Sequence, residues 1–270
     1  MGSFLVILGI TTAGFAGEIT PTNFKADYQK IDALKQKLAD NGLQVLGTHS
    51  VAGSNDYTVV LYTAPALQAA AQAPGRGFAG VLRILVDKQA QQLVASNPEY
   101  YLRAFLQKEY KDGMEAPVLA ALKKSLGTLT PSEDAMKTQK LSNYNFMIGM
   151  PHYDDFQCVG MDGTTTELCK KLETSAKDKI VFKLNLKADG SSVLYGVALS
   201  PEVEGFNLKL DTMGKSHLLP YTVLIENDTA CILPARYYLA LSFPQLSMTE
   251  FGRIMSTPGK IQSAFEAFFE

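Results

Sequence analysis

The 270-residue sequence contains no tryptophan, three histidines and three cysteines. No serine stands in a GxSxG motif and no HExxH motif is present, so the sequence offers no recognisable hydrolase or zinc-peptidase site. The cysteines form neither CxxC nor CxxCH, which excludes thioredoxin-type redox chemistry and covalent haem attachment. The formal net charge is −2, and neither half has the basic excess that nucleic-acid binding requires. No cofactor is expected.

The composition indicates a folded chain. Hydrophobic residues make up 46% and charged residues 19% of the sequence, which excludes a disordered or fibrous protein. A chain of this length can bury one large core or two of ordinary size.

Residues 1–17 are almost entirely apolar and carry no charge. The run is too short to span a bilayer comfortably, and Gly14 and Ala16 match the −3 and −1 positions of a signal-peptidase site. It therefore predicts a signal peptide and a periplasmic or secreted protein, although no Lys or Arg precedes it. The alternative is a core strand over residues 4–10 in a cytoplasmic protein. Membrane contact is expected only through this segment, if it is left uncleaved.

The cysteines suggest one disulfide. Cys158 and Cys169 are separated by a polar stretch, and in an oxidising compartment they could form a bond worth about 2–3 kcal/mol. Cys231 lies in the apolar run TACIL, which is typical of a buried thiol.

Blocks of sequence recur in the same order in the two halves of the chain, which indicates a duplicated unit. The paired blocks are KQKLADNGLQVLGTHSVAGSNDYTVVLYTAPAL (35–67) with CKKLETSAKDKIVFKLNLKADGSSVLYGVALSPEV (169–203), GRGFAGVLRILVD (75–87) with GKSHLLPYTVLIE (214–226), PEYYL (98–102) with PARYYL (234–239), and APVLAALKKSLGTL (116–129) with TPGKIQSAFEAFF (257–269).

Each half predicts the same series of elements. The series is a helix (28–39; 164–175), a strand pair (43–51 with 57–63; 180–187 with 193–199), a short helix starting at Pro65 or Pro201, a second strand pair (81–87 with 91–95; 221–226 with 229–233) and a closing helix near Pro117 or Pro258. We therefore predict an α+β fold of two tandem, related domains, each a small, mainly antiparallel sheet covered by helices. Their expected bounds are 18–130 and 144–270, with a linker over 131–143.

This pattern resembles the domain of unknown function 302 family. The matching residues are Ala64-Pro65, Leu218-Leu219-Pro220 with Val223, and Pro234, while the first unit departs at Ala79-Gly80-Val81. The resemblance implies a small bacterial or archaeal α+β domain, sometimes duplicated and sometimes exported, that self-associates. It implies no activity.

The stretch GRGFAG (75–80) fits the dinucleotide pattern G-x-G-x-x-G. That motif needs a strand before it and a helix after it, whereas here an alanine-rich helix precedes and a β-branched strand follows. We interpret it as a helix end and a turn. Gly75-Arg76 corresponds to Gly214-Lys215, so Arg76 and Lys215 are candidates for a small anion site. The alternative is two solvated charges near helix ends.

A second candidate is a copper-type metal site at Met150, His152 and Asp154, because thioether and imidazole ligands suit Cu(I). Met147 and Met150 are expected on opposite faces of a strand NFMIGM, which favours core methionines with a surface turn instead.

The remaining candidates are aromatic. Tyr100-Tyr101 and Tyr237-Tyr238 recur in register, as packing residues or as an aromatic wall for a ligand. His49 is expected to point outward from a hairpin, and His217, which matches Phe78, to occupy a packing position.

The sequence thus favours a binding protein for an unidentified partner or small ligand over an enzyme, with homo-oligomers allowed. The alternative is a metal carrier or enzyme that uses the His152 region or the Arg76 and Lys215 corners.

Overall fold

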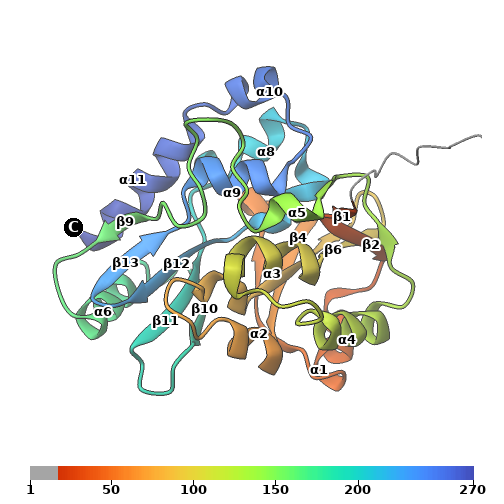
Figure 1. Ribbon diagram of the computed structural model, residues 1–270, viewed down its shortest axis with the longest axis horizontal. Coiled ribbons are helices and arrows are strands. Elements are labelled where there is room, and N and C mark those ends of the chain that lie inside the picture. Colours follow the sequence, from red (N-terminus) through yellow and green to blue (C-terminus); the bar gives the residue numbers. More distant parts are fainter. Residues whose placement is uncertain (1–17) are drawn as a thin grey trace, which may run out of the picture.

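A computed structural model describes residues 18–270 and confirms the α+β class (Figure 1). The first sheet has six strands in the order β3-β4-β5-β6-β2-β7, and the second has five in the order β10-β11-β12-β13-β9. Every strand pair in the two sheets is antiparallel. Within the described range, no helix is long and apolar enough to cross a membrane. The expected signal peptide, or strand 4–10, lies outside the described residues.

The structure contains the strands of the expected hairpins and further strands that the sequence did not predict. The first sheet contains β2 (Asn23–Asp27), β3 (Gln44–Ser50), β4 (Tyr57–Thr63), β5 (Leu82–Asp87), β6 (Gln92–Ser96) and β7 (Thr130–Pro131). The second contains β9 (Gln157–Gly160), β10 (Ile180–Asn185), β11 (Ser192–Val197), β12 (Tyr221–Glu226) and β13 (Thr229–Ile232). A separate pair joins β1 (Ile19–Pro21) to β8 (Ala135–Lys137). The expected linker therefore contributes strands to both the first sheet and this pair.

Many of the helices begin where the sequence supplies a capping side chain or a proline. Thr164 and Glu167 form a capping box at α6, and proline occupies the first turn of several others. The helices are α1 (Ile31–Asp40), α2 (Pro65–Ala70), α3 (Pro98–Leu106), α4 (Ala116–Leu126), α5 (Thr138–Leu141), α6 (Thr165–Ser175), α7 (Pro201–Glu204), α8 (Phe206–Lys209), α9 (Ala235–Ser242), α10 (Met248–Arg253) and α11 (Thr257–Phe269). Short 3₁₀ segments include η1 (Val51–Gly53), η2 (Gly77–Gly80), η3 (Gln107–Glu109) and η4 (Met213–Leu218).

The two sheets share one connectivity. When β2 is matched to β9 and β3–β6 to β10–β13, the five matched strands lie in the same order in both sheets. In Figure 1 the first sheet lies to the right and the second to the left, with α3 and α9 between them. The edge strands β3 and β10 are in contact. Residues of either half can therefore be compared by strand register as well as by sequence.

Each half places a 3₁₀ segment on the sheet of the other half. Segment η2 packs against β11 and β12, and η4 packs against β4, β5 and β6. Gly77 is needed for this packing, because a Cβ there would lie 2.4 Å from Leu224 Cδ1 and 2.7 Å from Leu186 Cδ1. The glycines of GRGFAG thus serve close packing between the halves.

Replacing Gly77 with alanine should lower the free energy of unfolding by about 1–3 kcal/mol, because the added methyl overpacks a buried contact. Gly259 is the matched control. It lies in α11 with no heavy atom within 4 Å of a built Cβ, so Gly259→Ala should raise the stability by up to about 1 kcal/mol. Urea unfolding of both variants would measure the two effects, and equal effects would contradict the packing role of Gly77.

The expected Cys158–Cys169 disulfide is wrong. Cys158 bonds to Cys231 instead, while Cys169 is a free, buried thiol on α6. The reason is the register of β9 and β13, which sets Cys158 directly opposite Cys231 with 3.9 Å between their Cα atoms. The buried free thiol that was expected at Cys231 is therefore that of Cys169. Burial raises the pKa of the Cys169 thiol.

Candidate functional site

The two cations singled out by the repeat lie at corresponding corners but in different surroundings. Arg76 is 6% exposed and forms ion pairs with Asp154 (2.6 Å) and Glu109 (3.1 Å). Lys215 is exposed and pairs with Asp134 at 2.6 Å. Both cations therefore already have carboxylate partners, and neither corner presents a bare cation to an anion.

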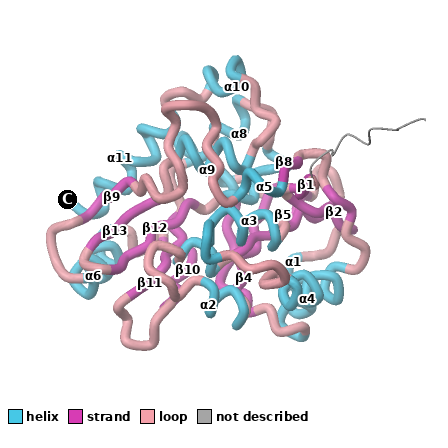
Figure 2. The backbone as a smooth tube through the Cα atoms, viewed as in Figure 1, coloured by secondary structure: helices cyan, strands magenta, loops and turns pink. Residues whose placement is uncertain are grey.

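The Arg76 corner is filled by aromatic side chains from the loop between α5 and β9, which Figure 2 shows as a long connection. The Tyr153 ring lies 5.0 Å from the Arg76 guanidinium carbon, and its hydroxyl donates to the Gly75 carbonyl at 2.7 Å. Phe156 lies against Gly75, where a built Cβ would be 3.3 Å from its ring. Phe78 packs edge-on to Tyr153.

The Lys215 corner, by contrast, holds a pocket of about 210 Å³ between the first sheet and the segment that enters η4. Polar side chains provide most of its lining. The lining residues are Asn23, Lys25, Gln92, Val94, Ser132, Glu133, Asp134, Asp211, Thr212, Gly214 and Lys215.

Strand register explains why one corner is filled and the other open. Lys25 lies opposite Val94 in the first sheet, as Cys158 lies opposite Cys231 in the second. Two residues before these positions lie Asn23, the first residue of β2, and Phe156, which directly precedes β9, so Asn23 corresponds to Phe156. The position that carries a pocket-filling ring at one corner thus carries a small amide at the other.

Asn23 is the most unusual group in this pocket. It is 2% exposed, its amide donates to Thr22 Oγ1 at 2.8 Å, and its Oδ1 has no hydrogen-bond partner among residues 18–270. A buried acceptor without a partner costs about 1–3 kcal/mol. Asn23 thus places an acceptor beside the pocket that no group in residues 18–270 uses.

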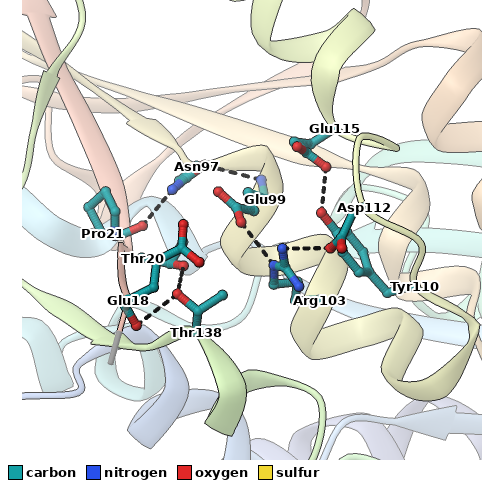
Figure 3. Close-up of polar contacts among 10 residues, drawn as sticks. All are labelled: Glu18, Thr20, Pro21, Asn97, Glu99, Arg103, Tyr110, Asp112, Glu115 and Thr138. Carbon is teal, nitrogen blue, oxygen red and sulfur yellow. Dashed lines mark hydrogen bonds and ion pairs between the residues drawn. The ribbon is translucent and has the colours of Figure 1, made fainter. Parts of the chain in front are cut away.

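The pocket wall formed by residues 132–134 lies directly beside Asn23 and is held in place by the N-terminal part of the chain. The Asp134 carbonyl accepts from the Thr22 backbone nitrogen (2.8 Å) and from the Ser132 hydroxyl (3.0 Å). Figure 3 shows the neighbouring contacts: Thr20 and Thr138 hydroxyls lie 2.7 Å apart, and Asn97, which caps α3, donates to the Pro21 carbonyl at 2.7 Å. The pocket is therefore bounded by fixed backbone.

The pocket carries charges of both signs. Lys25 and Lys215 supply cations, and Glu133, Asp134 and Asp211 supply carboxylates. Asp134 is 7% exposed and already neutralised by Lys215. The carboxylates can accept hydrogen bonds from donor groups of a ligand. Lys25 can donate a hydrogen bond to an acceptor group of the ligand.

The expected metal residues are not brought together. Residues 146–150 form bends and a turn rather than the expected strand, and the His152 backbone nitrogen donates to the Asp155 carboxylate at 2.8 Å. Asp154 binds Arg76 instead. Across residues 18–270 the structure contains no group of three or more His, Cys, Asp or Glu side chains placed to hold a metal ion.

The paired tyrosines lie inside the molecule, on α3 and α9, and are at most 2% exposed. Tyr100 donates to the Leu241 carbonyl (2.8 Å), and Tyr237 donates to the Ala104 carbonyl (3.2 Å). The Tyr238 hydroxyl donates to the Leu218 carbonyl at 3.3 Å. The first two bonds are reciprocal and join the two halves, whereas the third lies within the second half. The tyrosines therefore pack between helices and form no accessible aromatic wall.

His49 does not point outward as expected. It is 8% exposed, and its Nε2 lies 2.9 Å from Glu204 Oε2, on α7 of the other half. The same carboxylate accepts from the backbone nitrogens of Ala52 (2.9 Å) and Leu199 (3.0 Å). Glu204 thus satisfies three donors at the boundary between the halves.

Sequence reasoning identified Lys215 but missed Asn23, Lys25, Asp134 and Asp211. The repeat was the available signal, but its paired blocks begin after Asn23 and Lys25, and Asp134 falls in the expected linker. No family model matches the chain, and neither a curated protein nor a solved structure matches it.

Proposed function

We propose that this protein is a non-enzymatic binding protein of two related α+β units, exported from the cell, that holds a small polar molecule in the pocket beside Lys215. The unpartnered Oδ1 of buried Asn23 carries the proposal. The ligand donates a hydrogen bond to this atom. The equal strand order of the two sheets supports the duplication, and the Cys158–Cys231 disulfide supports an oxidising compartment.

The contrast between the two corners supports a ligand role for the pocket. At the Arg76 corner, Phe156 and Tyr153 pack beside Gly75 and the cation, so protein side chains occupy this position. The pocket also lies where residues of both halves meet, which is a common place for ligand sites. A metal carrier is not favoured, because Asp154 is engaged by Arg76 rather than directed to His152.

The Asn23→Phe variant tests this function, since it gives the open corner the ring that fills the other. The probes are the twenty amino acids, simple hexoses, polyols and small amines, screened by thermal shift and then by calorimetry. We expect at least one of these probes to bind, and Asn23→Phe to weaken it by tenfold or more, equivalent to about 1.4 kcal/mol. Lys25→Ala, an exposed substitution that leaves the fold intact, should weaken it less.

Asn143→Phe is the matched control, because Asn143 lines a separate, more open groove beside Tyr144 and Phe146. It should leave the affinity unchanged. Absence of binding by every probe, or equal loss in Asn23→Phe and Asn143→Phe, would contradict the proposal.

A further inference from the structure

A buried, positively charged cluster lies between the halves, separate from the pocket beside Lys215. Arg83, on β5, is 5% exposed, and no carboxylate in the described part of the chain forms an ion pair with it. Its one hydrogen bond runs from Nη2 to the Pro220 carbonyl at 3.4 Å, and its Nε has no partner. A guanidinium is always charged, so burying it without a counterion is costly.

Two further groups in this region lack partners. His217 Nδ1 and Ser242 Oγ are both buried and unpartnered within residues 18–270. Tyr101 links them, because its hydroxyl lies 3.4 Å from His217 Nε2 and beside Ser242. Burial is the main influence on the pKa of both Tyr101 and His217. The positive charge of Arg83 partly offsets the rise that burial causes at Tyr101 and adds to the fall that burial causes at His217. Arg83 also lies over the Tyr238 ring at 6.0 Å, and Tyr238 donates to the Leu218 carbonyl, next to His217, so the three residues share one region between the halves.

Each of the three unpartnered atoms carries a hydrogen that it can donate. Burial, helped by Arg83 and Lys215, lowers the pKa of His217 to about 3, so the ring is neutral. Burial raises the pKa of Tyr101, which keeps its proton and can donate it to His217 Nε2. The His217 proton then lies on Nδ1. Arg83 Nε and His217 Nδ1 thus each have a hydrogen to give and no acceptor, and the Ser242 hydroxyl beside Tyr101 can donate as well.

Packing does not require this polarity, because the corresponding cluster in the other half is largely apolar. The repeat matches Arg83 to Thr222 and His217 to Phe78, and setting Tyr100-Tyr101 over Tyr237-Tyr238 matches Ser242 to Phe105. There Phe105 packs on Tyr153 and Tyr238 at ring distances of 5.7 and 6.0 Å. The polar residues are therefore specific to one of two equivalent places.

We propose that Arg83, His217 and Ser242 bind a small inorganic anion of the halide class inside the molecule, as the missing counterion of Arg83. The pocket beside Lys215 does not include these residues in its lining, so the proposed anion site is separate from it. The anion would tie η4 and α9 of one half to β5 of the other.

Crystals of the full chain soaked in bromide test the site directly. We expect an anomalous bromide peak in contact with Arg83 Nε and Ser242 Oγ. In solution, exchanging gluconate for chloride at constant ionic strength should raise the melting temperature, with the unfolding equilibrium constant falling about tenfold per tenfold chloride above its dissociation constant.

The variants separate a specific site from general salt effects. Arg83→Met should abolish the chloride dependence, and Arg253→Met, which removes an exposed arginine of α10, should keep it. Water alone at the site, a wild type indifferent to chloride, or a chloride effect that Arg83→Met retains would overturn the proposal. A bromide peak without any chloride dependence in solution would mark an adventitious ion only and also overturn it. If Arg83→Met fails to fold, the bromide peak and the wild-type chloride dependence decide.

Discussion

Loss of the Cys158–Cys231 disulfide, in the Cys231→Ser variant or under a thiol reductant, should lower the free energy of unfolding by about 4 kcal/mol. The two cysteines are 73 residues apart in sequence, and the chain-entropy estimate for a closed loop of that length gives this magnitude. The bond also ties β9, at the edge of the second sheet, to β13. Denaturant unfolding with and without reductant would measure the effect.

Cys169→Ala is the control for this prediction. Cys169 is a free thiol, so its removal should cost much less and should leave the response to reductant unchanged. The observed pairing would be contradicted if reductant did not change the free energy of unfolding of the wild type. It would also be contradicted if Cys169→Ala abolished the effect of reductant.

Truncation of Glu204 should have an effect of similar size. Glu204→Ala leaves His49 and the Ala52 and Leu199 backbone nitrogens without their acceptor in a buried place. Removing one partner from a buried ionic network typically costs about 3–5 kcal/mol. We expect a large fall in the urea midpoint.

Glu202→Ala on the same helix is the comparison for Glu204. The Glu202 side chain is 78% exposed and pairs with Lys260 on the surface, so its loss should change the stability by less than about 1 kcal/mol. If both variants lost the same stability, the effect would come from helix α7 itself and not from the buried carboxylate.

Much of the fold could be predicted because its signals are local. The strand pairs alternate with turn residues, and prolines mark helix starts, so β3–β6, β10–β13, α1 and α6 lie within a few residues of their expected bounds. The remaining matched strand of each sheet, β2 in the first and β9 in the second, was not predicted from the sequence. Both are short, and their pairing partners lie about 70 residues away. Failure to recognise β9 also led to the wrong disulfide.

The candidate site was harder to predict, because its groups are defined by what they meet in space. Asn23 and Asp134 are more than a hundred residues apart, and nothing in either local sequence shows that one acceptor is left unpartnered. His49 lies on a hairpin that would suit an outward side chain, yet its partner Glu204 is 155 residues away. The repeat did identify both cationic corners, but their carboxylate partners lie outside the repeated blocks.

The reciprocal placement of η2 and η4 means that neither half of the chain is a complete folding module. Each sheet is covered in part by a segment supplied from the other half, so a cut in the connection at 131–143 would leave two fragments that stay associated. The single chain makes internally the exchange that a swapped dimer of a one-unit protein would make between subunits. A free half would expose the sheet face from which its partner's segment is missing, and so would favour pairing with a second half.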